Sequence, residues 1–235
     1  MDLGDDPLVE ALYRLIRTGE LSPGQRVDQR IISERLNVSR TPLREALRAL
    51  AVDGILTRTP NAGYAVAKLS AGDLLQYYSI RAFLEDQVLA AVEWPTEEQL
   101  DSLRRANEAC RVAAEAGALE ELMAANMAFH FAMFRWSTLT IMAKEIERIW
   151  RVSDPYRALH LSNRERRSHV AVDHDRMIEA IEARDAERLI ELQDAHRATS
   201  RVLLQDMLGN ALPPSLMALP QSAAQLAVLA PAAAG

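Results

Sequence analysis

The feature that most constrains this chain is the helical periodicity that runs almost unbroken from about residue 70 to Leu208. Apolar residues recur there at three- and four-residue intervals, which is the spacing of one face of an α-helix, and no strand pattern interrupts them. The expected helices are Asp73–Val92, Thr96–Ala116, Leu119–Arg135, Thr138–Leu159, Asn163–Ala183 and Asp185–Leu208. Such a set predicts an all-helical bundle, whose interior is a common place for a small-molecule or metal site.

The residues before this region form shorter segments. We expect three helices, over Pro7–Thr18, Gln29–Leu36 and about Thr41–Asp53, followed by two short strands with the sequences ILTRT and YAVAK. The PNAG between these strands holds residues that turns use. Three helices and a hairpin predict a winged helix-turn-helix domain.

The sequence therefore predicts a mainly α protein with two domains, a winged helix-turn-helix over residues 1–69 and a helical bundle over residues 70–208. The remaining residues, 209–235, are rich in alanine and proline and lack charge. We expect this tail to be disordered.

Charge is distributed unevenly along the 235 residues. The formal net charge is −6, yet residues 25–68 hold eight basic and four acidic residues. A basic segment on an acidic body suits a protein of which one part approaches phosphates. No apolar run is long enough to span a bilayer, the N-terminus lacks the pattern of a signal peptide, and the single cysteine, Cys110, allows no internal disulfide. These features favour a cytoplasmic protein without a membrane partner, with Cys110 serving as buried packing.

The stretch VSRTPLREAL, residues 38–47, predicts a well-defined helix start. Pro42 suits the first turn of a helix, and Ser39 or Thr41 can cap its free backbone amides. Arg40 and Arg44 are nevertheless unfavourable charges near a helix N-terminus. The cost is a few tenths of a kcal/mol, whereas an arginine paired to guanine is worth roughly 1–3 kcal/mol of discrimination.

Helical spacing separates these arginines from the apolar residues. Arg40, Arg44 and Arg48 follow one another at intervals of four. Another face of the same helix carries Leu43, Ala46, Leu47 and Leu50. One face is thus expected to pack and the other to contact DNA, although the spacing alone also fits a solvated face with Glu45 and Asp53 as ion-pair partners.

Residues 21–66 resemble the winged-helix DNA-binding domain of the GntR family of bacterial transcription regulators. The resemblance implies base or phosphate contacts before the turn, in the recognition helix and in the wing. The residues so implicated are Arg30, Ser39, Arg40, Thr41, Arg44, Asn61 and Gly63. Gly63 also has a local reason, since a tight hairpin turn often needs positive φ.

Histidines in the second region are candidates for a metal site. His130 follows Asn126 by four residues, so both lie on one helix face, while His174 and His196 come from two later helices. Three helices could therefore bring three imidazoles and an amide oxygen together. A single histidine is more often a surface group or a satisfied core group.

The sequences NMAFHFAMF, VDHDRMIEAIEARD and ELQDAHRA resemble the ligand-bearing helices of the FCD subgroup of FadR-like GntR regulators. The resemblance implies metal ligands at Asn126, His130, His174 and His196, without His160 and His169. The first ligand is commonly aspartate in the family, and the amide here is neutral. Three imidazoles suit Zn²⁺ or Ni²⁺.

Arg81 resembles the arginine that family members direct into the same cavity, where a guanidinium would bind an organic carboxylate. The alternative is an ion pair between Arg81 and Glu85, one turn further on. Both interpretations stay open at the level of sequence.

The sequence thus predicts a homodimeric repressor that binds a pseudo-palindromic operator in double-stranded DNA and responds to a small organic acid bound at a divalent-metal site. One alternative is direct sensing of the metal ion. A second is a metal-dependent hydrolase or isomerase with an accessory DNA-binding domain, since a metal held by three histidines can activate water. Because the sequence offers no convincing general base, we expect no enzyme.

Overall fold

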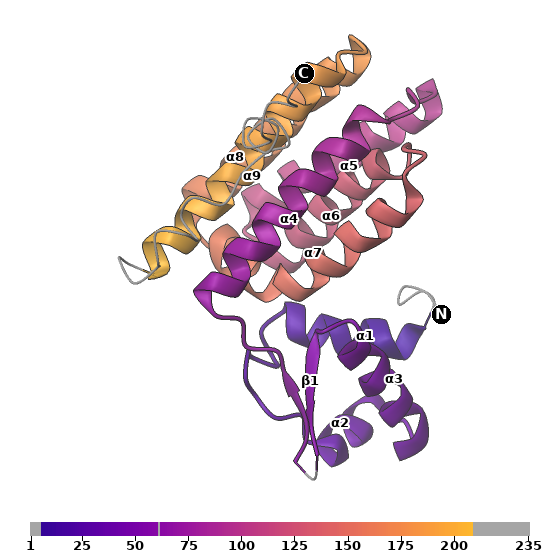
Figure 1. Cartoon of the computed structure of the whole chain (residues 1–235), viewed down its shortest axis with the longest axis vertical. Coiled ribbons are helices and arrows are strands. Elements are labelled where there is room, and N and C mark those ends of the chain that lie inside the picture. Colours follow the sequence, from indigo (N-terminus) through magenta and orange to yellow (C-terminus); the bar gives the residue numbers. More distant parts are fainter. Residues whose placement is uncertain (1–5, 61, 209–235) are drawn as a thin grey trace, which may run out of the picture. The chain divides into compact units, whose positions relative to one another are not determined.

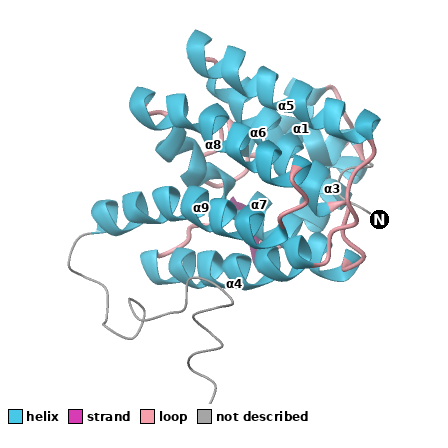
Figure 2. Ribbon diagram, turned by 90° about the horizontal axis from the view of Figure 1, so that it is seen from above, coloured by secondary structure: helices cyan, strands magenta, loops and turns pink. Residues whose placement is uncertain are grey.

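The structure is a computed structural model that describes residues 6–60 and 62–208. Its elements (Figure 1) are α1 (Pro7–Arg17), α2 (Gln29–Leu36), α3 (Arg40–Val52), β1 (Leu56–Thr59), β2 (Gly63–Val66), α4 (Ala71–Ala90), α5 (Glu97–Ala116), α6 (Leu119–Phe134), α7 (Thr140–Leu161), α8 (Arg164–Glu182) and α9 (Ala186–Leu208). Helices dominate the described residues (Figure 2), and the mainly α prediction is confirmed. The tail over residues 209–235 and the wing residue Asn61 lie outside the described residues.

Two compact units make up the chain. One consists of residues 1–69 and 150–158, and the other of residues 70–149 and 159–235. The first unit holds α1 to α3, the hairpin and a part of α7, while the second holds the remaining helices.

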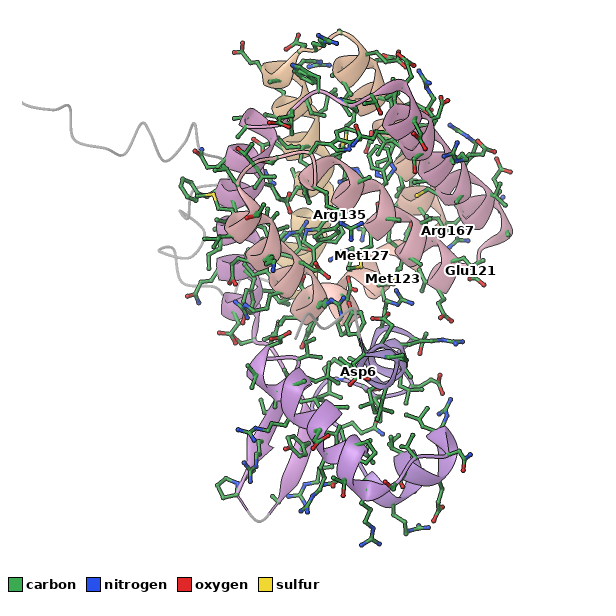
Figure 3. The ribbon with its side chains drawn as sticks, turned by 90° about the vertical axis from the view of Figure 1, so that its right-hand side faces the viewer. Asp6, Glu121, Met123, Met127, Arg135 and Arg167 are labelled. Carbon is green, nitrogen blue, oxygen red and sulfur yellow. The ribbon has the colours of Figure 1, made fainter. Side chains whose placement is uncertain are left out.

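A side-chain cap defines the start of α1 but not the start of α3. Asp6 (labelled in Figure 3) accepts hydrogen bonds from the backbone amides of Leu8 and Val9 at the start of α1. Ser39 occupies the N-cap position of α3, but its side chain makes no capping hydrogen bond, and Thr41 already lies in the first turn. The expected cap of α3 is therefore not formed by either hydroxyl, and the start of this helix has amides free to contact a ligand.

The core of the first unit forms between α1 and α3. The apolar face expected for α3 is buried, with Leu43, Ala46, Leu47 and Leu50 at most 1% exposed. They pack with the α1 residues Val9, Leu12, Tyr13 and Ile16. Fully burying one such side chain contributes about 1.5–3 kcal/mol, so this core holds the arginine-bearing face of α3 outward.

The hairpin of β1 and β2 is antiparallel, with Arg58 opposite Tyr64 and Thr59 opposite Gly63. Gly63 has a φ of +85°, which confirms the positive φ expected at this turn and which L-residues rarely adopt. The backbone amide of Val27 also donates to the carbonyl of Tyr64, at 2.9 Å. The segment before α2, expected to be a loop, therefore flanks the hairpin and fixes its position.

Residues 150–158 of α7 belong to the first unit, although the sequence placed the whole helix in the second domain. The Tyr13 hydroxyl of α1 donates to the buried carboxylate of Asp154. Burial and the negative charge of Asp154 raise the pKa of Tyr13 well above its usual value. Arg157 pairs with the same carboxylate at 2.9 Å and stacks over Trp150. Proximity between segments distant in the sequence decides this assignment, and helical periodicity carries no information about it.

In the second unit, local signals define the helix ends within two residues of the expected bounds. Ser70 with Asp73 and Thr96 with Gln99 form capping boxes at α4 and α5. Gly117, at φ +70°, ends α5. Helix α5 packs against α6 and α8, and α9 packs against α4 and α8, so α6, α8 and α9 can direct side chains into one interior. Among the described residues, no helix has the length and apolar character needed to cross a bilayer.

Candidate nucleic-acid interface and metal centre

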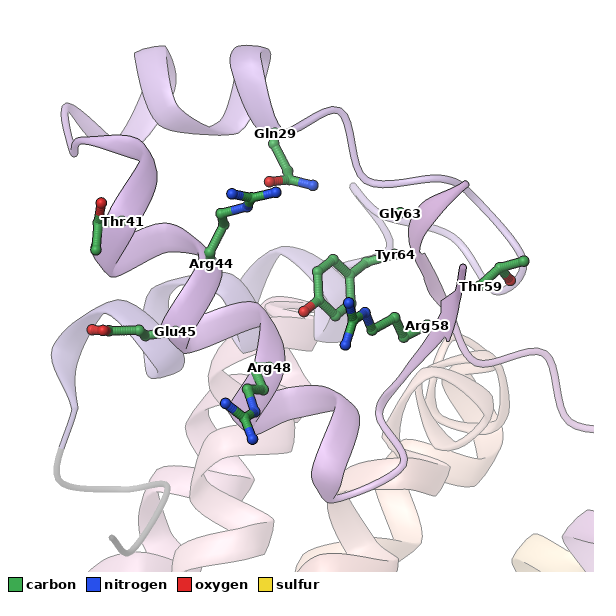
Figure 4. A pocket seen from close by; sticks show the side chains of 9 residues that line it. All are labelled: Gln29, Thr41, Arg44, Glu45, Arg48, Arg58, Thr59, Gly63 and Tyr64. Carbon is green, nitrogen blue, oxygen red and sulfur yellow. The ribbon is translucent and has the colours of Figure 1, made fainter. Parts of the chain in front are cut away.

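A groove of about 820 Å³ lies between α3 and the hairpin of the first unit (Figure 4). Its lining consists of Gln29, Thr41, Arg44, Glu45, Arg48, Arg58, Thr59, Gly63 and Tyr64. Arg44 projects from α3 into this space, and Arg58 and Tyr64 lie across from it on the hairpin. Three guanidinium groups and one carboxylate give the groove a positive charge.

The lining includes three of the residues expected to contact DNA, namely Thr41, Arg44 and Gly63. Ser39 and Arg40 are exposed at the start of α3, and Arg30 is exposed on α2, where it pairs with Glu34 at 3.0 Å. An exposed pair of this kind contributes little to stability, so a phosphate can replace its carboxylate at low cost.

Arg58 and Tyr64 were not among the DNA contacts expected from the sequence, although they line the groove. They face each other across the hairpin, Arg58 on β1 and Tyr64 on β2. The signal that could have found them is the antiparallel register, because directly paired residues point to the same side of a sheet. Exposed arginines and a tyrosine hydroxyl are groups that bind phosphate oxygens.

A cluster of imidazoles lies inside the second unit. His130 of α6, His174 of α8 and His196 of α9 each place a ring nitrogen within 4.8 Å of the others. The Nε2 atoms of His130 and His174 are 3.3 Å apart. Both side chains are fully buried, and His196 is 16% exposed. Burial and the two neighbouring imidazoles hold the pKa of His174 well below its usual value, so the ring is neutral, as a metal ligand must be.

Asn126 lies one turn before His130 on α6 and is also buried. Among the residues that the structure describes, its Oδ1 atom has no hydrogen-bond partner. Leaving such an oxygen buried and unpaired costs about 1–3 kcal/mol, which a bound cation would offset. The set of three imidazoles and one amide oxygen thus fits a first-row divalent ion.

Two polar residues near the histidines were missed from the sequence. Asp173 accepts from Nδ1 of His196 at 3.1 Å, and Asn107 of α5 lies 3.1 Å from Nδ1 of His174. Asn107 follows Leu100 and Leu103 on the buried face of α5, and a polar residue on such a face is a signal that could have found it. His169 is exposed on α8, and the side chain of His160 lies outside the described part of the chain.

Arg81 of α4 is 4% exposed, and its Nε donates to Glu85 at 2.8 Å. The ion pair considered as an alternative therefore forms. Glu85 also pairs with Arg197 of α9 and accepts a hydrogen bond from Gln193. Arg81 thus belongs to a buried charged network between α4 and α9.

Comparisons with known protein families match both units. Residues 6–66 match the gntR family of bacterial regulatory proteins, and residues 76–199 match the FCD domain.

Several curated proteins are similar to this chain. The transcriptional regulator McbR of Escherichia coli is 31% identical over 75% of the chain and 81% of its own length. The transcriptional repressor GlaR, also of E. coli, is 28% identical over 82% of the chain and 92% of its own length. The solved structure of E. coli McbR/YncC superimposes with a TM-score of 0.78 at 26% identity, covering 86% of this chain and 97% of that one.

Proposed function

The chain belongs to the GntR family of bacterial regulatory proteins and is a DNA-binding transcription regulator with an FCD domain, and on this premise we propose that it is a repressor whose operator affinity responds to a small carboxylate bound at a divalent-metal site. The observation that carries the proposal is the convergence of His130, His174 and His196, with the buried Asn126 one helical turn before His130. The family and the similar proteins are transcriptional regulators rather than enzymes.

In this proposal the two expected domains have different functions, operator binding and effector binding. Residues 1–69 bind the operator through Arg30, Ser39, Arg40, Thr41, Arg44, Asn61 and Gly63, and residues 70–208 bind the metal and the effector. Because one winged helix covers only a half-site, the protein acts as a homodimer on a pseudo-palindrome. Light scattering tests this, and a monomer at micromolar concentration would contradict it.

Zn²⁺ or Ni²⁺ is the proposed ion, held by Asn126, His130, His174 and His196. When bound, the ion supplies a Lewis acid that can also accept carboxylate oxygens. Arg81 is proposed to complement the charge of the effector. This requires that the effector compete with Glu85 for the guanidinium, since the two side chains are paired.

The same ion pair favours a second candidate function, direct sensing of the metal. If Arg81 stays bound to Glu85, its guanidinium is not offered to an organic acid, and in this second candidate function binding of the ion alone changes operator affinity. The two candidates predict different results in one experiment.

The test measures operator affinity against a panel of small hydroxy and dicarboxylic acids, with and without a chelator. We expect one acid to change the affinity about 5–150-fold, the range of ordinary allosteric coupling, and chelation or Arg81→Ala to suppress that change. A response to the metal without any acid would favour direct metal sensing. If no acid acts, or if chelation changes nothing, the effector site lies elsewhere.

A further inference from the structure

We propose that Asn107 is a positioning residue that selects the ring tautomer of His174 and directs its Nε2 into the imidazole cluster. Asn107 supplies no ligand itself and is 2% exposed on α5, a helix that carries none of the four proposed ligands. The expected effect of Asn107 on metal affinity rests on the metal site proposed above. The orientation of the His174 ring, in contrast, can be measured without a metal.

The hydrogen bonds of Asn107 define which way its amide faces. Its Nδ2 lies 3.1 Å from the carbonyl oxygen of Ala171 and 2.7 Å from Oδ1 of Asp175. Both partners can only accept, so the amide nitrogen must be on that side and Oδ1 must face His174. The orientation of this amide therefore follows from its surroundings.

An amide oxygen can only accept a hydrogen bond. Because Oδ1 of Asn107 is 3.1 Å from Nδ1 of His174, the proton of the neutral ring must reside on Nδ1. The other nitrogen, Nε2, is then left with a free lone pair. This is the atom that lies 3.3 Å from Nε2 of His130, inside the cluster.

Phe129 restricts the same ring in another direction. It stacks on His174 with the ring centroids 3.8 Å apart and the planes 4° from parallel. Stacking fixes the plane of the imidazole but permits a half-turn about the Cβ–Cγ bond, which returns the ring to the same plane with its nitrogen and carbon positions exchanged. The hydrogen bond to Asn107 distinguishes these two orientations, so the two contacts together specify the direction of Nε2.

Asp175 and Arg111 support the amide. Arg111 lies one turn after Asn107 on α5 and donates to both oxygens of Asp175, at 2.8 and 3.1 Å. Asp175 follows His174 by one residue on α8 and accepts from Asn107. The resulting chain of hydrogen bonds polarises the amide of Asn107 and strengthens the hydrogen bond that its Oδ1 accepts from His174.

The competing explanation is that Asn107 only ties α5 to α8. A structural tie predicts a loss of stability on mutation with no change in the protonation of the His174 ring. The two explanations can therefore be separated by observing the ring itself.

The experiment uses the full chain with Asn107→Leu, which keeps a branched side chain and removes the acceptor. Ring ¹⁵N spectra of the metal-free protein report the tautomer, with the His174 signals assigned by their loss in His174→Ala. Zinc affinity is measured by chelator competition. Leu103→Ala, one turn earlier on the same buried face, is the control for lost packing.

We expect the wild-type ring to be protonated on Nδ1 and the Asn107→Leu ring to show a mixture that includes protonated Nε2. Zinc affinity should fall about 10–100-fold in Asn107→Leu, as is usual when a hydrogen-bond partner of a ligand is lost, and stay unchanged in Leu103→Ala. An unaltered tautomer in Asn107→Leu overturns the proposal, whatever happens to stability. If wild type binds no zinc but the tautomer changes as expected, the metal site fails and the role of Asn107 stands.

A second variant covers the case in which Asn107→Leu does not fold. Asn107→Ala removes the same acceptor with a smaller side chain that cannot clash with α8. This variant should also show a mixture that includes protonated Nε2. A ring still protonated only on Nδ1 there would also overturn the proposal.

Discussion

The arginine-lined groove of the first unit and the imidazole cluster of the second use polar side chains in opposite ways. Arg44, Arg48 and Arg58 are exposed, so water solvates their charges whether or not a ligand is bound. His130, His174 and Asn126 are buried, so protein atoms or a bound ion must satisfy them. Ligand binding is therefore expected to alter the free energy of unfolding more per contact in the cluster than in the groove.

The two sites also differ in how far apart their residues lie in the sequence. The groove is built by residues 29–64, from elements that follow one another directly. The cluster needs residues 126–196, from three helices. A surface for an extended polyanion can form from neighbouring elements, whereas a site for one small ion requires side chains to converge inside a packed bundle.

The largest expected effect is the loss of the metal on removing two imidazoles. Wild type should bind about one divalent ion per chain, and His174→Ala with His196→Ala should bind none, because imidazole nitrogens supply most of the affinity. Metal analysis and calorimetry measure this. The matched control is His169→Ala, an exposed histidine on α8, which should keep the ion. If the double variant binds as much metal as His169→Ala does, His174 and His196 are packing residues and not metal ligands.

The next effect concerns the groove. Arg44→Ala should weaken binding to the operator by about 1–3 kcal/mol and binding to random duplex by less, because a bidentate contact to guanine is lost. Competition binding with both duplexes measures the difference. Arg105→Ala, an exposed arginine on α5, serves as the control and should change neither affinity. Equal losses on both duplexes would remove the base-contacting role of Arg44.

A third test addresses the buried oxygen of Asn126. In the presence of a chelator, Asn126→Leu should raise the free energy of unfolding by about 1–3 kcal/mol, since an unpaired buried acceptor is removed. With zinc present, the same variant should lose part of the stabilisation that the ion provides to wild type. Urea denaturation with and without chelator measures both. A variant that zinc stabilises as much as it stabilises wild type would contradict the role of Asn126 as a ligand.

The smallest expected effect is on salt dependence. Arg58→Ala should weaken binding to operator and random DNA alike and make the slope of log K against log salt less steep by about 0.9, the value of one lost phosphate contact. Binding curves at several salt concentrations measure the slope. An unchanged slope would place Arg58 outside the phosphate contacts, despite its position in the groove.

Much of the fold could be predicted from the sequence, because helices and turns depend on residues that are close together in the chain. Helical patterning and turn residues placed the helices of the described residues within two residues of their bounds, because packing needs an apolar face at a spacing of about 3.6 residues and turns interrupt it. The apolar face of α3 and the positive φ of Gly63 followed from the same local rules. The histidines of the cluster were predicted with the help of a family resemblance, since spacing placed only Asn126 and His130 on a common face.

Contacts between distant segments could not be predicted in this way. Only the tertiary structure brings Asn107 to His174, pairs Glu85 of α4 with Arg197 of α9, and joins residues 150–158 of α7 to the first unit. A periodic pattern says which face of a helix is buried but not which side chain it meets there. The sequence by itself therefore determined the helices, while packing decided which polar groups of the described residues are paired and which, such as the oxygen of Asn126, are not.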